Sequence, residues 1–353
     1  MALHKNNVSQ VLEPKAFVRD VCSRIDFAKK TVLAQSMHLE AGPLICEFAD
    51  SLMRASKRGV DVSLNIDGFA LMIHKEIPIH LPILSRKKRS YVCDLKKQNQ
   101  KLISDLRKSG VNVTFTNVPG NLSKYFFFWK RNHIKMVVVD KEVAYIGGVN
   151  FSDINLGLVD FMVRIHESKV IDALSEQFDK INGNNPTQDL RLECGADYTM
   201  FIDSGKSGKS LIRDEVCKLV KTAKRNVRVI TTQYYPGTEF ESALRYAANK
   251  KISIEFITTH PRLMPTRLAH LTSLGRMVTG NFPVKYNKYS RIHAKLLIID
   301  DGEKVMFGSH NFNNDILVTV GTQELSILSR NRVLNEKLLD YYRSVENSIH
   351  NNL

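Results

Sequence analysis

The sequence is poor in cysteine and has no long apolar run. Its 353 residues include five cysteines, which are scattered, odd in number and without the spacing of a metal site or a redox pair. A reducing compartment is therefore expected. No stretch approaches the roughly 18 uncharged apolar residues that cross a bilayer, and the first residues lack the apolar core of a signal peptide. We therefore expect a cytoplasmic protein without a transmembrane segment.

Acidic residues are outnumbered. The chain has 36 Asp and Glu against 51 Lys and Arg, a net charge of +15. Residues 71–132 hold 13 basic and 3 acidic residues of these totals. Such an excess predicts an anionic partner, either nucleic acid or the negatively charged surface of a lipid bilayer. A solvated basic face is the simpler alternative.

Two common kinds of ligand site are also missing. No cluster of His, Cys or carboxylate residues has the spacing of a metal site, so neither a metal nor another cofactor is expected. Residues 203–210 are similar to a phosphate-binding loop, but Asp203 stands where the first glycine of that loop is required. A turn followed by a serine at the start of a helix explains the same residues.

What the chain does contain is one motif written twice. A histidine and a lysine two residues apart precede four apolar residues and an aspartate, and two small residues and an asparagine follow a second short apolar run. The first copy is His133, Lys135, Asp140, Gly147, Gly148 and Asn150, and the second is His293, Lys295, Asp300, Gly308, Ser309 and Asn311.

The apolar run in each copy predicts a strand that is buried on both faces. Side chains two apart on a strand project to the same side, so each histidine and lysine should face one common space. The aspartate has the opposite parity and should brace the turn at the end of the strand. The His, Lys, Asp and Asn positions are the catalytic candidates, and the two Gly and the Gly-Ser positions are expected to bind substrate.

The rest of the chain is duplicated as well. A helical pattern at residues 17–30 leads into an apolar run at 31–34, as residues 211–225 lead into 227–231. Likewise the helical residues 43–57 precede a strand at 60–66, as residues 239–249 precede 252–257. This alternation predicts an α/β fold of two similar halves, each a mixed β-sheet flanked by helices.

The two halves differ in length and share one active site. The offset between them falls from 192 residues (252 against 60) to 160 (293 against 133), so the first half carries an insertion of 32 residues, placed at about 71–132. The polar, turn-rich residues 182–188 mark the boundary, which gives halves of 1–185 and 186–353. Neither half has both histidines, so the active site should form where they meet, on a pseudo-two-fold axis.

The duplicated motif resembles that of the phospholipase D superfamily. The flanking residues 130–133 and 159–165 are most similar to those of bacterial cardiolipin synthases and related phosphatidyltransferases, although Ile134 stands where those enzymes usually have arginine. The resemblance implies that one histidine attacks phosphorus to form a phosphohistidine while the other protonates the leaving oxygen. It also implies that Asp160 holds His133 and that Glu324 holds His293. The residues give no reason to prefer either histidine as the nucleophile.

An aromatic run at residues 125–129 lies between basic residues. Aromatic rings beside Lys and Arg suit a membrane interface, although a buried strand or a stacking surface for single-stranded nucleic acid would use the same residues. The expected membrane-binding residues are Arg86, Lys87, Lys88, Arg89, Phe127 and Trp129.

Two enzyme classes therefore stay open. The first is a phosphatidyltransferase or phospholipase that acts on anionic phospholipid and associates peripherally with the membrane. The second is a metal-independent nuclease. A binding module with an inactive site is disfavoured because all eight His, Lys, Asp and Asn positions are present.

Overall fold

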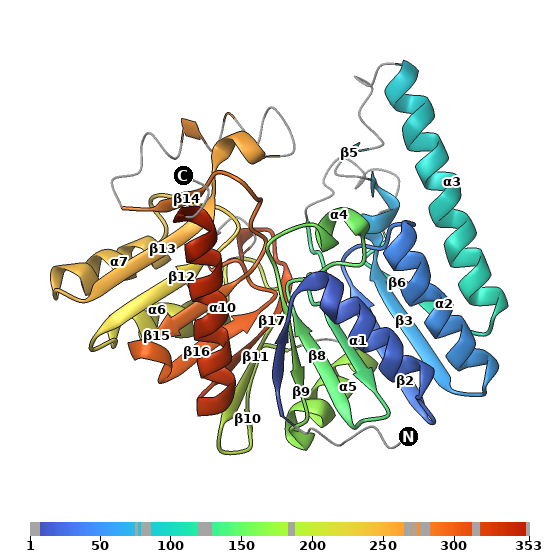
Figure 1. Ribbon diagram of the computed structural model, residues 1–353, viewed down its shortest axis with the longest axis horizontal. Coiled ribbons are helices and arrows are strands. Elements are labelled where there is room, and N and C mark those ends of the chain that lie inside the picture. The colour runs from blue at the N-terminus through green and yellow to red at the C-terminus, as the bar shows by residue number, and fades with distance from the viewer. Residues whose placement is uncertain are drawn as a thin grey trace.

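The computed structural model describes residues 8–74, 77–78, 86–118, 129–182, 188–264, 271, 274–275, 283–312 and 318–350. Two sheets lie side by side with helices on both of their faces (Figure 1). The predicted α/β fold of two similar halves is confirmed. Among the described residues, no helix is both long and apolar enough to cross a bilayer.

The first sheet has seven strands in the order β1-β9-β8-β7-β2-β3-β6. Strands β2, β3 and β6 run parallel, and the other neighbouring pairs are antiparallel. The strands are β1 (Gln10–Leu12), β2 (Thr31–Ser36), β3 (Asp61–Asp67), β6 (Asn112–Thr116), β7 (Met136–Val139), β8 (Val143–Gly147) and β9 (Met162–Ile165).

The second sheet repeats this plan and adds an edge strand, in the order β10-β11-β17-β16-β15-β12-β13-β14. Its strands are β10 (Leu190–Cys194), β11 (Tyr198–Ser204), β12 (Asn226–Ile230), β13 (Ser253–Thr259), β14 (Lys285–Asn287), β15 (Leu296–Ile299), β16 (Lys304–Gly308) and β17 (Gln323–Ser329). The short pair β4 (Ile73–His74) and β5 (Ile77–Pro78) stands apart from both sheets.

The helices cover opposite faces of the sheets. They are α1 (Pro14–Asp26), α2 (Pro43–Lys57), α3 (Arg86–Lys108), α4 (Asp153–Leu156), α5 (Ser168–Asn182), α6 (Leu211–Lys221), α7 (Glu239–Asn249) and α10 (Arg332–His350). Side chains that alternate along β2 and β7 enter different cores, one on each face of the first sheet. Val32 and Val137 pack with α1 and α2, whereas Leu33 and Val138 pack with α5. The core that contains α5 also contains α10 and runs across the junction of the two halves.

Several predicted elements match. The bounds of α2 and α7 are those expected from the helical pattern, whereas α1 begins three residues earlier than expected because Pro14 occupies its first turn. Ser210 accepts a hydrogen bond from the backbone N–H of Arg213, as expected for a serine that caps a helix rather than a phosphate loop.

The expected insertion at 71–132 is not a single segment. It contains β6, which pairs with β3 as β14 pairs with β13. The additional residues therefore lie on both sides of β6, and those before it include α3. The predicted boundary between the halves, between residues 185 and 186, lies within residues 183–187, which are outside the described residues.

Candidate active site

His133 and His293 occupy equivalent places, just before β7 and β15. The first is 7% exposed and the second is partly buried. In each sheet this strand lies beside the carboxyl end of a parallel strand, β2 or β12. The two histidines therefore sit at equivalent ends of their sheets, where the parallel strands have their carboxyl ends.

Two isolated β-bridges join the halves beside these histidines. In the first, Asn132 pairs with Gln323, and the N–H of His133 donates to the carbonyl of Gln323 at 2.9 Å. Because Glu324 directly follows Gln323, the bridge brings a carboxylate of the second half to the histidine of the first.

The second bridge has the same design. Val159 pairs with Ile292, and the N–H of His293 donates to the carbonyl of Val159 at 2.8 Å. Asp160, which follows Val159, thereby comes to the histidine of the second half.

The carboxylates hold the histidines across the junction. Nδ1 of His133 lies 2.9 and 3.0 Å from the two carboxylate oxygens of Glu324, and Nδ1 of His293 lies 2.7 Å from Oδ2 of Asp160. The expected pairing, Asp160 with His133 and Glu324 with His293, is therefore wrong. Within the first half, β8 separates β9 from β7, and two strand spacings amount to about 10 Å. Each carboxylate is thus too far from the histidine of its own sheet.

These pairs fix the protonation of the resting site. Burial lowers the pKa of His133 to about 4 even though the charge of Glu324 opposes it, and burial together with the charge of Lys295 lowers the pKa of His293 to about 3. Burial alone would raise the pKa of Glu324, but the charge and hydrogen bond of His133 hold it at about 2. Burial, the largest single effect, would also raise the pKa of Asp160, but the hydrogen bond and charge of His293 together with the charge of Lys295 outweigh it and lower that pKa. Both imidazoles are therefore neutral near pH 7, and each Nδ1–H faces a carboxylate, while Nζ of Lys295 lies 3.0 and 3.2 Å from Nδ1 and Nε2 of His293.

Two buried lysines provide positive charge beside the histidines. Nζ of Lys135 donates to the carbonyl of His133 at 2.5 Å, and Nζ of Lys295 donates to the carbonyl of His293. Burial lowers the pKa of Lys295 to about 8. Burial and the charge of Lys295 lower the pKa of Lys135 well below its usual value. Two buried ammonium groups that repel each other favour the binding of an anion between them.

The motif asparagines are fixed by hydroxyl groups. Oδ1 of Asn150 accepts from the hydroxyl of Ser36 at 3.4 Å, and Oδ1 of Asn311 accepts from the hydroxyl of Thr232 at 2.9 Å. Ser36 ends β2 and Thr232 follows β12, so the carboxyl ends of equivalent strands orient both amides.

The three glycines of the motif leave room for a close neighbour, either a carboxylate or a backbone carbonyl, and the serine holds a carboxylate. A Cβ on Gly148 would lie 2.3 Å from Oδ1 of Asp160, and one on Gly147 would lie 2.3 Å from the carbonyl oxygen of Phe161. In the second half a Cβ on Gly308 would lie 2.2 Å from the carbonyl oxygen of Leu325, and the hydroxyl of Ser309 donates to Glu324. The expectation that these four residues bind substrate stays a prediction.

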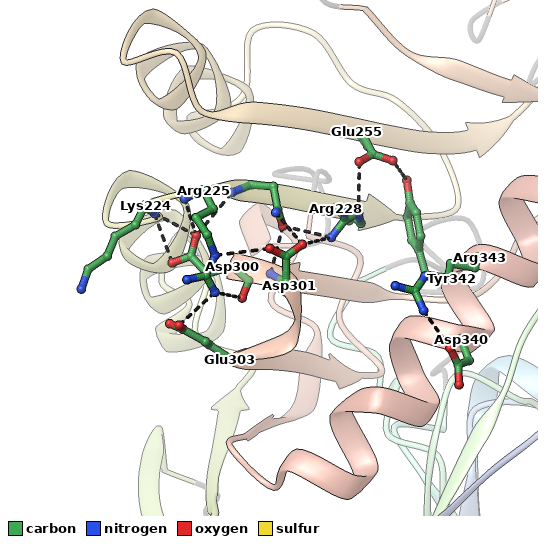
Figure 2. Close-up of polar contacts among 11 residues, drawn as sticks. Lys224, Arg225, Arg228, Glu255, Asp300, Asp301, Glu303, Asp340, Tyr342 and Arg343 are labelled. Carbon is green, nitrogen blue, oxygen red and sulfur yellow. Dashed lines mark hydrogen bonds and ion pairs between the residues drawn. The ribbon is translucent and has the colours of Figure 1, made fainter.

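The motif aspartates lie at the opposite ends of β7 and β15 from the histidines. Asp140 accepts hydrogen bonds from the backbone N–H groups of Lys30 at 2.7 Å and Thr31 at 3.0 Å. Asp300 accepts from those of Lys224 and Arg225, as Figure 2 shows, at 2.9 and 2.7 Å. These carboxylates brace the turns that lead into the neighbouring strands β2 and β12, rather than, as expected, the turns at the ends of their own strands.

The residues that position the segments before the histidines were not predicted from the sequence. Asp67, at the end of β3, accepts from the N–H of Asn132 at 2.7 Å and from Nη1 of Arg131 at 2.9 Å. Thr259, at the end of β13, accepts from the N–H of Ile292 at 2.9 Å. The only signal was a polar residue that ends an apolar strand, which many strands share.

The expected membrane-binding residues are only partly described. The side chains of Arg86, Lys87, Lys88 and Arg89, at the start of α3, and all of Phe127 lie outside the described part. Trp129 is 51% exposed and Lys130 beside it is also exposed, four and three residues before His133. Within the described ranges, no group of three or more His, Cys, Asp or Glu residues is placed to hold a metal ion.

Comparison with known proteins agrees with this geometry. The chain is 22% identical over 368 aligned positions to cardiolipin synthase B of Salmonella typhimurium, which covers 99% of this chain and 80% of that protein. It is 23% identical over 308 positions to cardiolipin synthase B of Escherichia coli K12, which covers 82% and 68%. The crystal structure of phosphatidylserine synthase from Haemophilus influenzae shares the fold, with a TM-score of 0.65 at 14% identity over 99% of this chain and 87% of that chain.

The pattern of a single family matches both halves, at residues 21–182 and 216–345. These ranges include both histidines and both lysines as well as the carboxylate Glu324. The chain therefore belongs to the family described as cardiolipin synthase, PLD-like domain.

Proposed function

We propose that the protein is a phosphatidyltransferase that cleaves a phosphodiester bond of a phospholipid through a phosphohistidine intermediate. The observation that carries this proposal is the pair of imidazoles, His133 and His293, each held at Nδ1 by a carboxylate of the other half. A neutral imidazole with Nδ1 fixed presents Nε2 as a nucleophile.

The charges of the site suit a phosphodiester. The ammonium groups of Lys135 and Lys295, together with the amides of Asn150 and Asn311, supply positive charge and donors for the phosphoryl oxygens. One histidine attacks phosphorus, and the other gives its proton to the departing alcohol. The acceptor alcohol then loses its proton to that second histidine and takes the phosphatidyl group from the first.

The protonated histidine is expected to form with the substrate. In the resting site the pKa values of His133 and His293 are about 4 and 3, so near neutral pH neither imidazole carries a second proton, at Nε2, to donate to the leaving oxygen. A bound phosphodiester anion offsets the two lysine charges, and this raises the pKa of the imidazole beside the leaving oxygen. The general acid is therefore created by binding.

The relatives suggest the lipid. The aligned proteins are cardiolipin synthases, and the alignment with the Salmonella protein runs over 99% of this chain. We therefore propose a cardiolipin synthase-like reaction, in which the alcohol of one phosphatidylglycerol accepts the phosphatidyl group of another. The exposed Trp129 and Lys130, close to His133, together with a net charge of +15, support docking on an anionic bilayer.

Purified protein incubated with phosphatidylglycerol vesicles in EDTA tests the reaction. We expect a new diphosphatidyl lipid from the unchanged protein, and a loss of several orders of magnitude in His133→Ala and in His293→Ala. His166→Ala is the matched control, because His166 lies beyond the far end of β9, where its Nδ1 is 3.2 Å from the carbonyl of Glu142. Full activity in either active-site variant would contradict the two-histidine mechanism. Cleavage of single-stranded DNA without any lipid product would replace the proposal by a nuclease.

Vesicle sedimentation tests the docking. Changing Arg86, Lys87, Lys88 and Arg89 together to Ser should weaken pelleting at low salt, because each basic residue near the surface contributes about 1 kcal/mol that salt screens. Trp129→Ser should weaken it at high salt as well, since burial of the ring does not depend on charge. Phe27→Ser is the control. Phe27 is 65% exposed, but it lies between α1 and β2, before the amino end of β2 and so at the opposite end of the strands from His133.

A further inference from the structure

A cavity lies at the junction of the two halves. It measures about 240 Å³ and is bounded by the C-terminal part of α10, the start of α1 and residues 157–160. Helices α10 and α1 lie on the same face of the molecule, α10 on the second half and α1 on the first, with this junction between them (Figure 1). Its polar lining consists of Glu13, Asp160, Ser290, Tyr341, Ser344 and Ser348. Of these, only Asp160 takes part in the active site.

The lining offers hydrogen-bond acceptors and few donors. The hydroxyl of Ser344 donates to the carbonyl of Tyr341 at 2.8 Å, so its oxygen presents lone pairs to the cavity. The hydroxyl of Ser348 likewise donates to its own helix, to the carbonyl of Val345 at 2.6 Å. The carboxylate of Glu13, which precedes α1 without capping it, can only accept.

Backbone N–H groups beside the cavity already donate hydrogen bonds within the protein. The N–H groups of Gly157, Leu158 and Val159 donate to carbonyls at 3.1, 3.1 and 3.0 Å respectively. A ligand that brings N–H or O–H groups is therefore matched to this lining, whereas a ligand made only of acceptors is not.

The cavity is negative within a basic protein. Two of its lining residues, Glu13 and Asp160, are acidic, and no lysine or arginine lines it. Burial and the charges of Asp160 and Glu13 raise the pKa of Tyr341 well above its usual value. The rest of the chain is strongly positive, with a net charge of +15. The local charge therefore favours a cation.

One buried donor of this lining makes no hydrogen bond within the described part of the chain. The hydroxyl of Tyr341 is buried and makes no hydrogen bond, while its ring packs 4.8 Å from that of Phe161. An unpaired buried hydroxyl is unfavourable, and a phenylalanine would fill the same place without that cost. The hydroxyl is therefore expected to donate to a ligand oxygen.

We propose that this cavity binds a small primary ammonium ion that also carries a hydroxyl group. The ammonium donates to the carboxylate of Glu13 and to the serine oxygens, and the ligand hydroxyl accepts from Tyr341. The four non-hydrogen atoms of ethanolammonium, together with a few waters of about 30 Å³ each, fit the available volume. The site depends on no step of the proposed reaction, so it can be tested by binding alone.

Three probes of similar size separate the contributions of charge and hydroxyl. Titrations of the full chain at pH 7.5 with ethanolammonium, ethylammonium and ethylene glycol are followed by saturation-transfer NMR and calorimetry. We expect ethanolammonium to bind most tightly and ethylene glycol at least about tenfold more weakly, because the glycol lacks the charge. Equal binding of ethanolammonium and ethylene glycol, or no saturable binding of ethanolammonium, would overturn the proposal.

Two variants locate the site. Glu13→Gln should weaken ethanolammonium to the level of ethylene glycol, whereas Glu142→Gln, which removes an exposed carboxylate elsewhere, should leave the affinity unchanged. Tyr341→Phe should weaken ethanolammonium to the level of ethylammonium and leave ethylammonium unaffected. If Glu13→Gln binds ethanolammonium as tightly as the unchanged protein does, the cation lies elsewhere and the assignment is wrong.

Discussion

The exchange of carboxylates between the halves can be tested by a double-mutant cycle. The variants are His133→Gln, Glu324→Gln and the double substitution, compared with a second cycle in which Asp160→Asn replaces the change at Glu324. The first pair shares two contacts of 2.9 and 3.0 Å, whereas Asp160 contributes to the hydrogen bonding of His293 and not of His133. Only the first cycle should therefore reveal a strong interaction.

The size of the effect follows from burial. Both partners of the first pair are more than nine-tenths buried, and a hydrogen bond to a charged group in such a place contributes about 1.5–3 kcal/mol. The coupling energy between His133 and Glu324 should lie in that range. Residues without a shared contact are additive within about 0.5 kcal/mol, which is the value expected for His133 with Asp160.

Urea unfolding followed by circular dichroism at pH 7 measures each free energy of unfolding. At this pH the imidazole is neutral and the carboxylate is ionised, because their pKa values are about 4 and about 2. Stability is the appropriate readout, since all these variants should lose turnover. A coupling of His133 with Asp160 that equals or exceeds its coupling with Glu324 would refute the arrangement described above.

Three further outcomes are expected. The value of kcat/KM should fall as the pH rises through about 8, where Lys295 in the free enzyme loses its charge, and a profile that stays flat to pH 9.5 would contradict this role. Gly148→Ala should lower turnover on the order of 100-fold, since its Cβ would lie 2.3 Å from Asp160 and displace it, whereas Gly275→Ala, whose added Cβ would meet no atom of the described residues within 4 Å, should have no effect. Asp300→Asn should lower the free energy of unfolding by about 1.5–3 kcal/mol in urea and leave the pH profile unchanged, and a shifted profile would show that this residue acts on the histidine.

The features that depend on a local pattern of residues, namely the bounds of strands and helices, could be predicted from the sequence. The four apolar residues after each lysine form β7 and β15, and the parity of Asp140 and Asp300 on these strands predicts a structural role for both, although the turns that they brace precede β2 and β12. The helical period gave the bounds of α2 and α7. In each case the information lies within one turn or one strand of the residue concerned.

What depends on how the sheets meet could not be predicted. Asp160 and Glu324 were recognised as the orienting carboxylates, but assigning each to a histidine requires the strand order and the bridges across the junction. Nothing local distinguishes a carboxylate that serves its own sheet from one that serves the other. The same is true of Asp67, whose contacts with Arg131 and Asn132 span more than 60 residues of sequence.

The two bridges between the halves also limit how this molecule can move during its work. Asn132 with Gln323 and Val159 with Ile292 tie the halves together one residue away from both histidines. If the halves swung apart as rigid bodies, both imidazoles would lose their carboxylates in the same motion. A substrate would therefore enter and leave past a scaffold that stays closed, unlike in enzymes that open and shut two lobes about a hinge.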